Sequence, residues 1–210
     1  MKRRIQSIAV ATFFLAVLLS PLRATPPDAT TTEAFRLKLV AAAVERANHT
    51  VRYDSSYVAI PYPNGDVPEG TGVCSDEVIR SYRALGVDLQ KLVHEDAVRA
   101  RSEYPLKGRP DSNIDHRRVE NLMVYFRRQG ASLPITKNAA DYLPGDLVTW
   151  DLHDGKGKRL DHIGIVIDRK PFWHDRYMIL HNIGAGPKIE DVLFDWKITG
   201  HYRYYGPQTN

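Results

Sequence analysis

The hydrophobic pattern changes at Pro134, and this change limits the possible fold more than any other feature of the chain. Before Pro134, apolar residues recur with helical spacing, which predicts helices over residues 33–47, 74–85, 89–101 and 116–129. After it, turn residues separate short apolar runs, which predicts strands over residues 146–150, 162–168, 177–182 and 201–205. Helices followed by strands indicate an α+β fold, with the N-terminal helices packed on an antiparallel sheet.

Polar residues set the predicted starts of two helices. Thr32 is expected to cap the helix at 33–47, and Asp115 is expected to cap the helix at 116–129. Between the first two helices, residues 53–73 are rich in Tyr, Pro, Gly and Asp. We expect a loop there, with at most one short strand at residues 57–60.

The N-terminus has the pattern of a secretory signal peptide. Three basic residues at positions 2–4 precede a nearly unbroken apolar run, residues 8–19, and a cleavage site follows. An anchor that is not cleaved is the alternative. The sequence predicts a signal peptide (1–24), a disordered leader (25–32) and a single domain (33–210). After cleavage we expect no transmembrane helix and a periplasmic or secreted protein.

The basic character of the chain belongs to the predicted signal. Four of the 29 Lys and Arg residues lie in residues 1–24, and none of the 25 Asp and Glu residues does. The remainder therefore carries equal numbers of basic and acidic side chains. This balance gives no electrostatic basis for binding nucleic acid.

Cys74 is the only cysteine of the chain. Exported proteins usually use cysteines in pairs, as disulfides. A lone cysteine is either a buried apolar side chain or a reactive thiol. Cys74 lies where a loop leads into a predicted helix, and the N–H groups and dipole of a helix N-terminus favour a thiolate. This position predicts a nucleophile.

Two predicted strands supply a base for this thiol and a residue that can orient the base. His162 begins one strand, where alternation places it on the face opposite the strand's isoleucines. His181 and Asn182 end the next strand, and either side chain could accept the ring N–H of His162 and fix its tautomer. Each feature alone also has a purely structural explanation. Together they predict a site of the cysteine–histidine type.

A metal site at His153, Asp154, Asp161 and His162 is an alternative use of the same region. The basic turn at 155–159 would repel a divalent cation, and the spacing matches no compact set of ligands. Gly-rich phosphate loops and dinucleotide fingerprints are also absent from the sequence. We therefore expect neither a metal nor another cofactor.

Three motifs follow one another along the chain: Gly-Val-Cys-Ser-Asp at 72–76, Pro-Gly-Asp-Leu-Val-Thr-Trp at 144–150 and His-Ile-Gly-Ile-Val-Ile at 162–167. In this order they resemble the NlpC-type cell-wall cysteine peptidases, a superfamily with a papain-like fold. Within that superfamily, the chain is most similar to a family of exported bacterial proteins of unknown function. The segments that carry this closer similarity are 62–68, 113–119, 181–184 and 190–194.

The resemblance implies a papain-like fold and a role for each site residue. It implies that Cys74 is the nucleophile, His162 the base and His181 the third catalytic member, with Asn182 beside it. It also implies that Tyr62, in a Pro-Tyr pair twelve residues before the cysteine, helps to bind the oxyanion. The compartment then points to the stem peptides of peptidoglycan, or their fragments, as the partner.

Asp76 departs from the resemblance, because the related peptidases have glycine at this position. A carboxylate so close to the thiol raises its pKa unless the carboxylate points away, binds a substrate amine or pairs with Arg117. Asp76 could equally be an ordinary acid of the first helical turn. Asp115, His116 and Arg117 form a charged segment that either contributes to a substrate pocket or caps a helix in solvent.

The sequence therefore predicts a cysteine peptidase or amidase. Two other functions remain open on the same residues. The domain could bind cell-wall peptides without cleaving them, or it could transfer the acyl group to an acceptor other than water.

Overall fold

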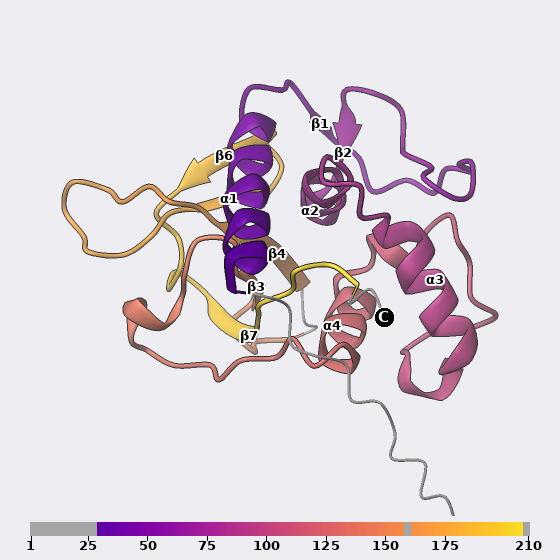
Figure 1. Ribbon diagram of the computed structural model, residues 1–210. Helices are drawn as coiled ribbons and strands as arrows, with labels where there is room; N and C mark the ends of the chain where they lie inside the picture. Colours follow the sequence, from indigo (N-terminus) through magenta and orange to yellow (C-terminus); the bar gives the residue numbers. More distant parts are fainter. Residues whose placement is uncertain (1–28, 158–160, 208–210) are drawn as a thin grey trace, which may run out of the picture.

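The computed structural model describes residues 29–157 and 161–207. In this part of the chain, four α-helices accompany a five-stranded sheet (Figure 1). The helices are α1 (Ala29–Arg46), α2 (Cys74–Arg83), α3 (Leu89–Arg99) and α4 (Val119–Arg128). The sheet strands are β3 (Leu147–Asp151), β4 (Asp161–Val166), β5 (Ile179–Asn182), β6 (Pro187–Glu190) and β7 (Lys197–Tyr202). Their order is β6-β5-β4-β3-β7, and every neighbouring pair is antiparallel. The predicted α+β fold is confirmed.

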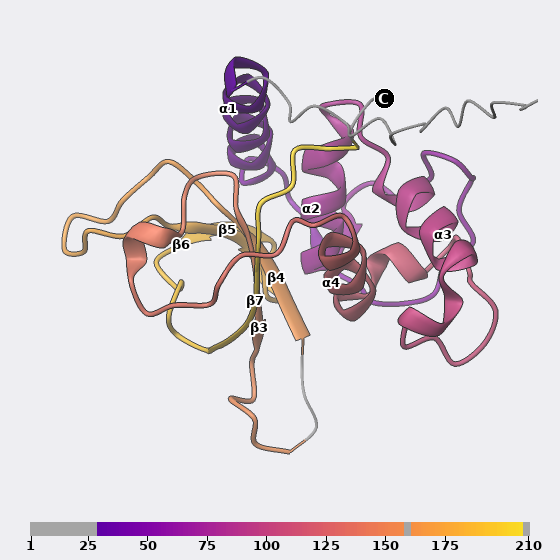
Figure 2. The ribbon, with the colours of Figure 1, turned by 60° about the horizontal axis from the view of Figure 1, so that its bottom comes forward.

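Helices α1, α2 and α4 cover one face of the sheet, and α3 packs against α2 and α4 farther from the strands (Figure 2). Alternation along β4 turns Ile163 and Ile165 toward α2 and α4, where they join the larger of two apolar clusters. On the other face, Trp150 and Val166 belong to the second cluster, which the segment around Leu193 helps to enclose. Both faces of the central strands are therefore buried. None of the described helices is long and apolar enough to cross a membrane.

Gly164 allows β5 to approach β4 closely. A Cβ atom at this position would lie 2.5 Å from Ile179 Cγ2 and 2.8 Å from the carbonyl oxygen of Leu180. A glycine here leaves room for a neighbouring element, and β5 is that element. The close approach brings the end of β5 beside the start of β4.

Asp146 explains the Pro-Gly-Asp motif that precedes β3. Its buried carboxylate accepts hydrogen bonds from Arg203 (2.7 and 2.9 Å), His201 Nε2 (2.8 Å) and the N–H of Leu143 (2.8 Å). These contacts fix the turn before β3 to β7. The motif therefore stabilises the sheet and does not contact Cys74.

The N-terminal helix is longer than predicted. Residues 29–32 were expected in the disordered leader, with Thr32 as the cap, but they form the first turn of α1. No proline or glycine lies between Ala29 and Glu33, so nothing in the sequence stops the helix at Thr32. Residues 25–28 and the predicted signal lie outside the described residues.

Two other local predictions were wrong. Asp115 does not cap α4. It begins a 3-10 turn, Asp115–Arg117, and its carboxylate accepts the N–H of Asp111 (2.5 Å). The strand expected at residues 57–60 does not form. Instead, β1 (Arg52–Tyr53) pairs in parallel with β2 (Thr71–Gly72), directly before Cys74.

Candidate active site

Cys74 is the first residue of α2, as the sequence predicted. Its side chain is 4% exposed and packs in the cluster between the helices and the sheet. The backbone N–H groups of Ile163 and Ser75 both interact with the sulfur and favour its thiolate form. Because Ile163 follows His162, the thiol touches β4 at the residue next to the predicted base.

The hydroxyl of Tyr53 interacts with the Cys74 thiol. The parallel pair of β1 and β2 produces this contact, because Tyr53 lies opposite Gly72, two residues before Cys74. Burial and the neighbouring thiol both raise the pKa of Tyr53, so the phenol keeps its proton at neutral pH. A neutral hydroxyl beside the nucleophile is a hydrogen-bond donor for an oxyanion.

Asp76 pairs with Arg117, and its charge is one of the causes that raise the pKa of the Cys74 thiol. The carboxylate accepts hydrogen bonds from Nε and Nη2 of Arg117, each at 2.9 Å, and from the backbone N–H of Val73 at 2.7 Å. Both side chains are almost completely buried. Asp76 is therefore both a first-turn helix acid and the partner of Arg117, two of the roles left open by the sequence.

Arg117 also connects α2 to the segment that carries Tyr53. Its guanidinium donates to the carbonyl oxygens of Asp54 and Ser56, each at 3.2 Å. Its own carbonyl oxygen accepts the hydroxyl of Ser75 at 2.7 Å. One buried arginine thus holds together the start of α2, the 3-10 turn and the residues after Tyr53.

A chain of hydrogen bonds runs across the other face of the sheet. His162 Nε2 lies 2.8 Å from His181 Nδ1, and His181 Nε2 lies 2.8 Å from Glu190 Oε2. The antiparallel pairing of β4, β5 and β6 brings these three residues together. Both rings are about 1% exposed, whereas the Glu190 carboxylate is 41% exposed.

Glu190 fixes the tautomer of both histidines. An ionised carboxylate only accepts hydrogen bonds, so His181 must donate from Nε2. Neutral His181 then accepts at Nδ1, and His162 must donate from Nε2. The proton-accepting atom of His162 is therefore Nδ1, which has no hydrogen-bond partner among the described residues.

Two tryptophans enclose the histidine pair. The ring of Trp150 lies 5.8 Å from that of His162, and the ring of Trp196 lies 6.1 Å from each histidine ring. His162 thus packs on the face of β4 opposite the isoleucines, as alternation predicted. Among the described residues, no hydrogen bond joins the Cys74 thiol to either histidine. The part of the site that holds the thiol and the part that holds the histidine pair meet at the first residues of β4.

Both members of the predicted nucleophile–base pair are neutral in this structure. Burial raises the pKa of Cys74 to about 11, more than the N–H groups of Ile163 and Ser75 lower it. Burial, together with His181, lowers the pKa of His162 to about 3. The helix start was predicted to favour a thiolate, but the removal of water from around the sulfur outweighs that effect.

The alkylation rate of Cys74 is expected to depend on pH as this pKa dictates. At pH 7, a thiol with a pKa of about 11 is about 0.01% thiolate. The second-order rate constant with iodoacetamide should rise about tenfold per pH unit above pH 7 and level off near pH 11. Free cysteine, whose curve levels off near pH 8.5, is the control. A plateau for Cys74 below pH 8 would instead show that a thiolate–imidazolium pair exists in the resting protein.

The remaining predicted site residues lie away from the thiol or make contacts with other parts of the protein. Tyr62 is 43% exposed, and its ring packs against His94 of α3 at 5.2 Å. Asn182 does not bond to His162: its side-chain Oδ1 accepts the N–H of Gly184 (3.1 Å), and its buried Nδ2 has no hydrogen-bond partner among the described residues. His116 is buried, and burial lowers its pKa to about 3.

Sequence reasoning missed Tyr53 and Glu190. The Pro-Tyr spacing directed attention to Tyr62, whereas only the pairing of β1 with β2 brings a tyrosine to the thiol. Glu190 lies on β6, a strand of four residues that begins with proline and was not predicted. In the sequence, Lys188 and Glu190 alternate with the apolar Ile189, and this alternation was the signal that could have predicted β6.

Comparison with known protein families matches residues 40–204 to a family described as "Domain of unknown function (DUF1287)". The chain belongs to the DUF1287 family. A relative from Escherichia coli (strain K12), "Uncharacterized protein YijF", is 46% identical over 211 residues, covering 98% of this chain and 99% of the relative. The DUF1287 match includes Tyr53, Cys74 and both histidines of the site.

Two solved structures from Trichomonas vaginalis are similar to this DUF1287 chain. NlpC1 has a TM-score of 0.45 at 13% identity over 80% of the chain. NlpC2 has a TM-score of 0.42 at 14% identity over 86% of the chain. The chain spans less than half the length of each, 44% and 48%.

Proposed function

We propose that this protein is an exported cysteine hydrolase that cleaves an amide bond, with stem peptides of peptidoglycan as the substrate class. One observation carries the proposal: the thiol at the start of α2 meets β4 beside His162, and His162 begins a hydrogen-bonded chain through His181 to Glu190. The predicted signal peptide and the resemblance to NlpC-type peptidases support the compartment and the substrate.

The proposed reaction begins from a neutral thiol and a neutral imidazole. Sγ of Cys74 attacks the amide carbonyl carbon, and the thiol proton passes through water to Nδ1 of His162, because no hydrogen bond joins the two side chains in the resting protein. His181 and Glu190 stabilise the positive charge that forms on His162. The proton then moves to the leaving amine, and the C–N bond breaks to give a thioester. Water, which loses a proton to His162, hydrolyses the thioester and restores the thiol.

The oxyanion formed by this attack lies next to Sγ. The donors that we propose for it are the hydroxyl of Tyr53 and the first N–H groups of α2. Both kinds of donor are already in place before the substrate binds, because β1, β2 and α2 are held by the pairing of Tyr53 with Gly72 and by Arg117. Preorganised donors of this kind stabilise a transition state more than a ground state.

A protein that binds cell-wall peptides without cleaving them is the second candidate. The burial of Cys74 favours it, because a buried thiol with a pKa of about 11 is weakly nucleophilic until a base removes its proton. The two candidates differ in whether products form.

Digestion of purified peptidoglycan separates them. The protein is incubated with the polymer, and the soluble products are identified by liquid chromatography and mass spectrometry. We expect fragments whose new ends are an amine and a carboxylate within the stem peptide. Binding to the polymer with no new ends supports the second candidate, and fragments cut only between sugars contradict an amide hydrolase.

Tyr53→Phe and Tyr62→Phe form a matched pair that tests the oxyanion donor. Loss of the Tyr53 hydroxyl should lower kcat by about 10²-fold to 10³-fold with little change in KM, because the hydrogen bond strengthens in the transition state. Tyr62→Phe removes a hydroxyl of similar exposure near α3 and should leave kcat within about twofold. The reverse ranking would show that Tyr62 donates to the oxyanion.

A further inference from the structure

The loop that connects β4 to β5 carries two aromatic side chains that the protein does not cover. Phe172 is fully exposed and Trp173 is 71% exposed, which makes them the most exposed large apolar side chains among the described residues. The loop projects from the sheet at the end of the molecule opposite α3, as the orange segment on the left of Figure 1 and of Figure 2 shows. Two adjacent rings in water are unfavourable, so this patch indicates a docking surface.

Asp191 fixes the arrangement of this loop. Its carboxylate accepts hydrogen bonds from Nε1 of Trp173 (3.2 Å), Nδ1 of His174 (2.6 Å) and Nε of Arg176. The guanidinium of Arg176 also lies over the ring of Phe194, at 5.8 Å. Three hydrogen bonds to one carboxylate hold the loop in one conformation. The two rings are therefore presented to solvent by a fixed support.

The setting of each ring indicates the chemistry of the partner. The N–H of Trp173 is the polar group of the indole and already donates to Asp191, so the part of the ring left for a partner is carbon. Phe172 is open to solvent on both faces of its ring. A ring that stacks on a sugar lies against the protein and exposes one face. The two rings thus suit an apolar medium that surrounds them.

The charges near the rings balance. Three basic side chains are matched by three acidic ones: Arg169, Lys170 and Arg176, with Asp168, Asp175 and Asp191. Lys170 pairs directly with Asp175 (2.5 Å), and Arg176 pairs with Asp191. With His174 neutral, the loop and its support have no net charge. Such a loop matches phospholipid headgroups that carry one charge of each sign, and the rings must supply the binding free energy.

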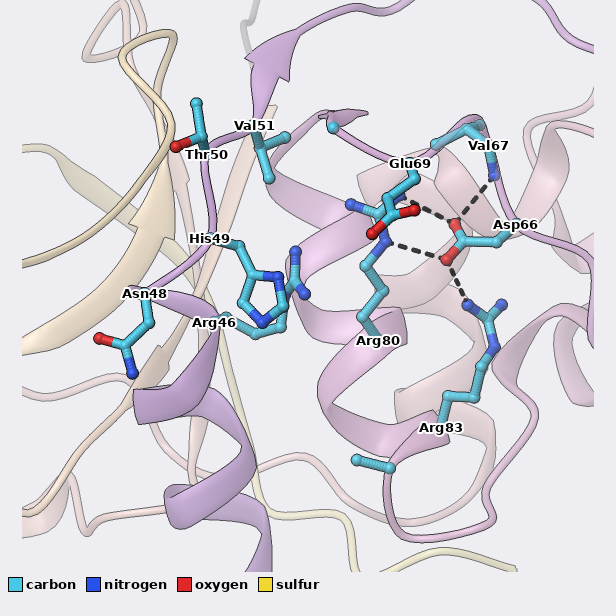
Figure 3. A pocket seen from close by; sticks show the side chains of 12 residues that line it. Arg46, Asn48, His49, Thr50, Val51, Asp66, Val67, Glu69, Arg80 and Arg83 are labelled. Atoms are coloured by element: carbon cyan, nitrogen blue, oxygen red, sulfur yellow. Dashed lines mark hydrogen bonds and ion pairs between the residues drawn. The ribbon is translucent and has the colours of Figure 1, made fainter.

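The hollows of the chain argue against a second copy as the partner. A cleft of about 910 Å³ beside α2 is lined by charged side chains, and Figure 3 shows Arg80 and Arg83 paired there with Asp66. A groove of about 580 Å³ between α1 and the residues after α2 is more apolar. A contact between that groove and the loop of another copy joins two different surfaces, which produces filaments unless the assembly closes into a ring.

We propose that residues 168–176 form a membrane-docking loop, in which Phe172 and Trp173 insert into the interface of a phospholipid membrane. Tryptophan is enriched in this interface, and binding there increases with the apolar area that leaves water. Once the predicted signal peptide is removed, the loop keeps the exported protein at the membrane surface. The proposal concerns the location of the protein and does not depend on whether Cys74 reacts.

Vesicle binding by the exported protein, after removal of the predicted signal peptide, tests the loop. Sucrose-loaded vesicles of phosphatidylcholine are sedimented, and the bound protein is measured over a range of lipid concentrations. Phe172→Ala should weaken binding at least about tenfold, because its ring no longer leaves water. Val98→Ala shortens an exposed apolar side chain on α3, at the other end of the molecule, and should change binding by less than about twofold. Both variants should unfold at the same urea concentration as the unmodified protein, because both side chains are exposed.

Tryptophan fluorescence shows whether the loop enters the lipid. Trp150 is buried and Trp196 is partly buried, so Trp173 is the indole that lipid can reach. Lipids with brominated acyl chains should quench its emission, and the emission should move to shorter wavelength on binding. Trp173→Phe should abolish this quenching. Quenching that persists in Trp173→Phe overturns the assignment to this loop.

Four other outcomes overturn the proposal. The first is that the unmodified protein does not bind the vesicles, and the second is that Phe172→Ala binds them equally well. The third is binding only to vesicles with about 30 mol% phosphatidylglycerol that is lost in about 0.5 M NaCl, because attraction by charge would then explain it. The fourth is a dimer or larger assembly, seen by sedimentation velocity without lipid, that Phe172→Ala dissociates. That result would assign the rings to a second copy of the chain.

Discussion

Cys74→Ala is expected to lower the rate of amide cleavage by about 10⁴-fold or more, because no other group in the site can form the covalent intermediate. The replacement removes one buried sulfur atom and should change the free energy of unfolding by only about 1 kcal/mol. Product formation is measured by liquid chromatography, and stability by urea denaturation. A folded variant that retains cleavage would contradict the mechanism.

His162→Ala provides the control for this prediction. If Cys74 and His162 act in one step, the double variant should be no slower than either single variant, because each removal already abolishes the same step. Losses that multiply in the double variant would show that the two residues contribute independently.

Arg117→Met is expected to destabilise the protein by about 3–5 kcal/mol, because it leaves the Asp76 carboxylate buried without a counter-ion. It also removes the donors to the carbonyl oxygens of Asp54 and Ser56. Urea denaturation followed by circular dichroism measures the loss. The rate of amide cleavage should fall as well, because Arg117 holds the segment that carries Tyr53.

Arg118→Met is the matched control for Arg117→Met. Arg118 is the next residue, is exposed, and has no salt bridge among the described residues. Its replacement should change stability by no more than about 0.5 kcal/mol. Equal losses in the two variants would show that the buried pair with Asp76 does not account for the effect.

The fold was predictable where one physical signal dominated. Val78, Tyr82 and Leu85 repeat at helical spacing, so the start of α2 at Cys74 was predicted correctly, although the helix ends at Arg83, two residues before the predicted end. The isoleucines of β4 alternate strictly, so the face of that strand that packs on the helices was also predicted correctly. The two-residue strands β1 and β2 have no such periodicity. They form because the residues around them are fixed by tertiary contacts such as those of Arg117.

The site was predictable in part for the same reason. Cys74 and His162 stand at element boundaries, which sequence patterns reveal. The pKa of Cys74 depends on how completely α2 and the sheet exclude water, and that depends on packing between distant segments. The contact of Tyr53 with the thiol and that of Glu190 with His181 arise from strand pairing, which local sequence does not specify.

The most direct measurement of the central claim is the mass of the protein during turnover. The reaction with a muropeptide is quenched in acid after a few milliseconds to seconds, and the protein is digested and analysed by mass spectrometry. We predict that the peptide containing Cys74 gains the mass of the acyl part of the substrate, as a thioester that hydroxylamine removes. The Cys74→Ala protein should show no such adduct. Product release by the unmodified protein with no adduct on Cys74 at any time, together with equal release by Cys74→Ala, would contradict the account.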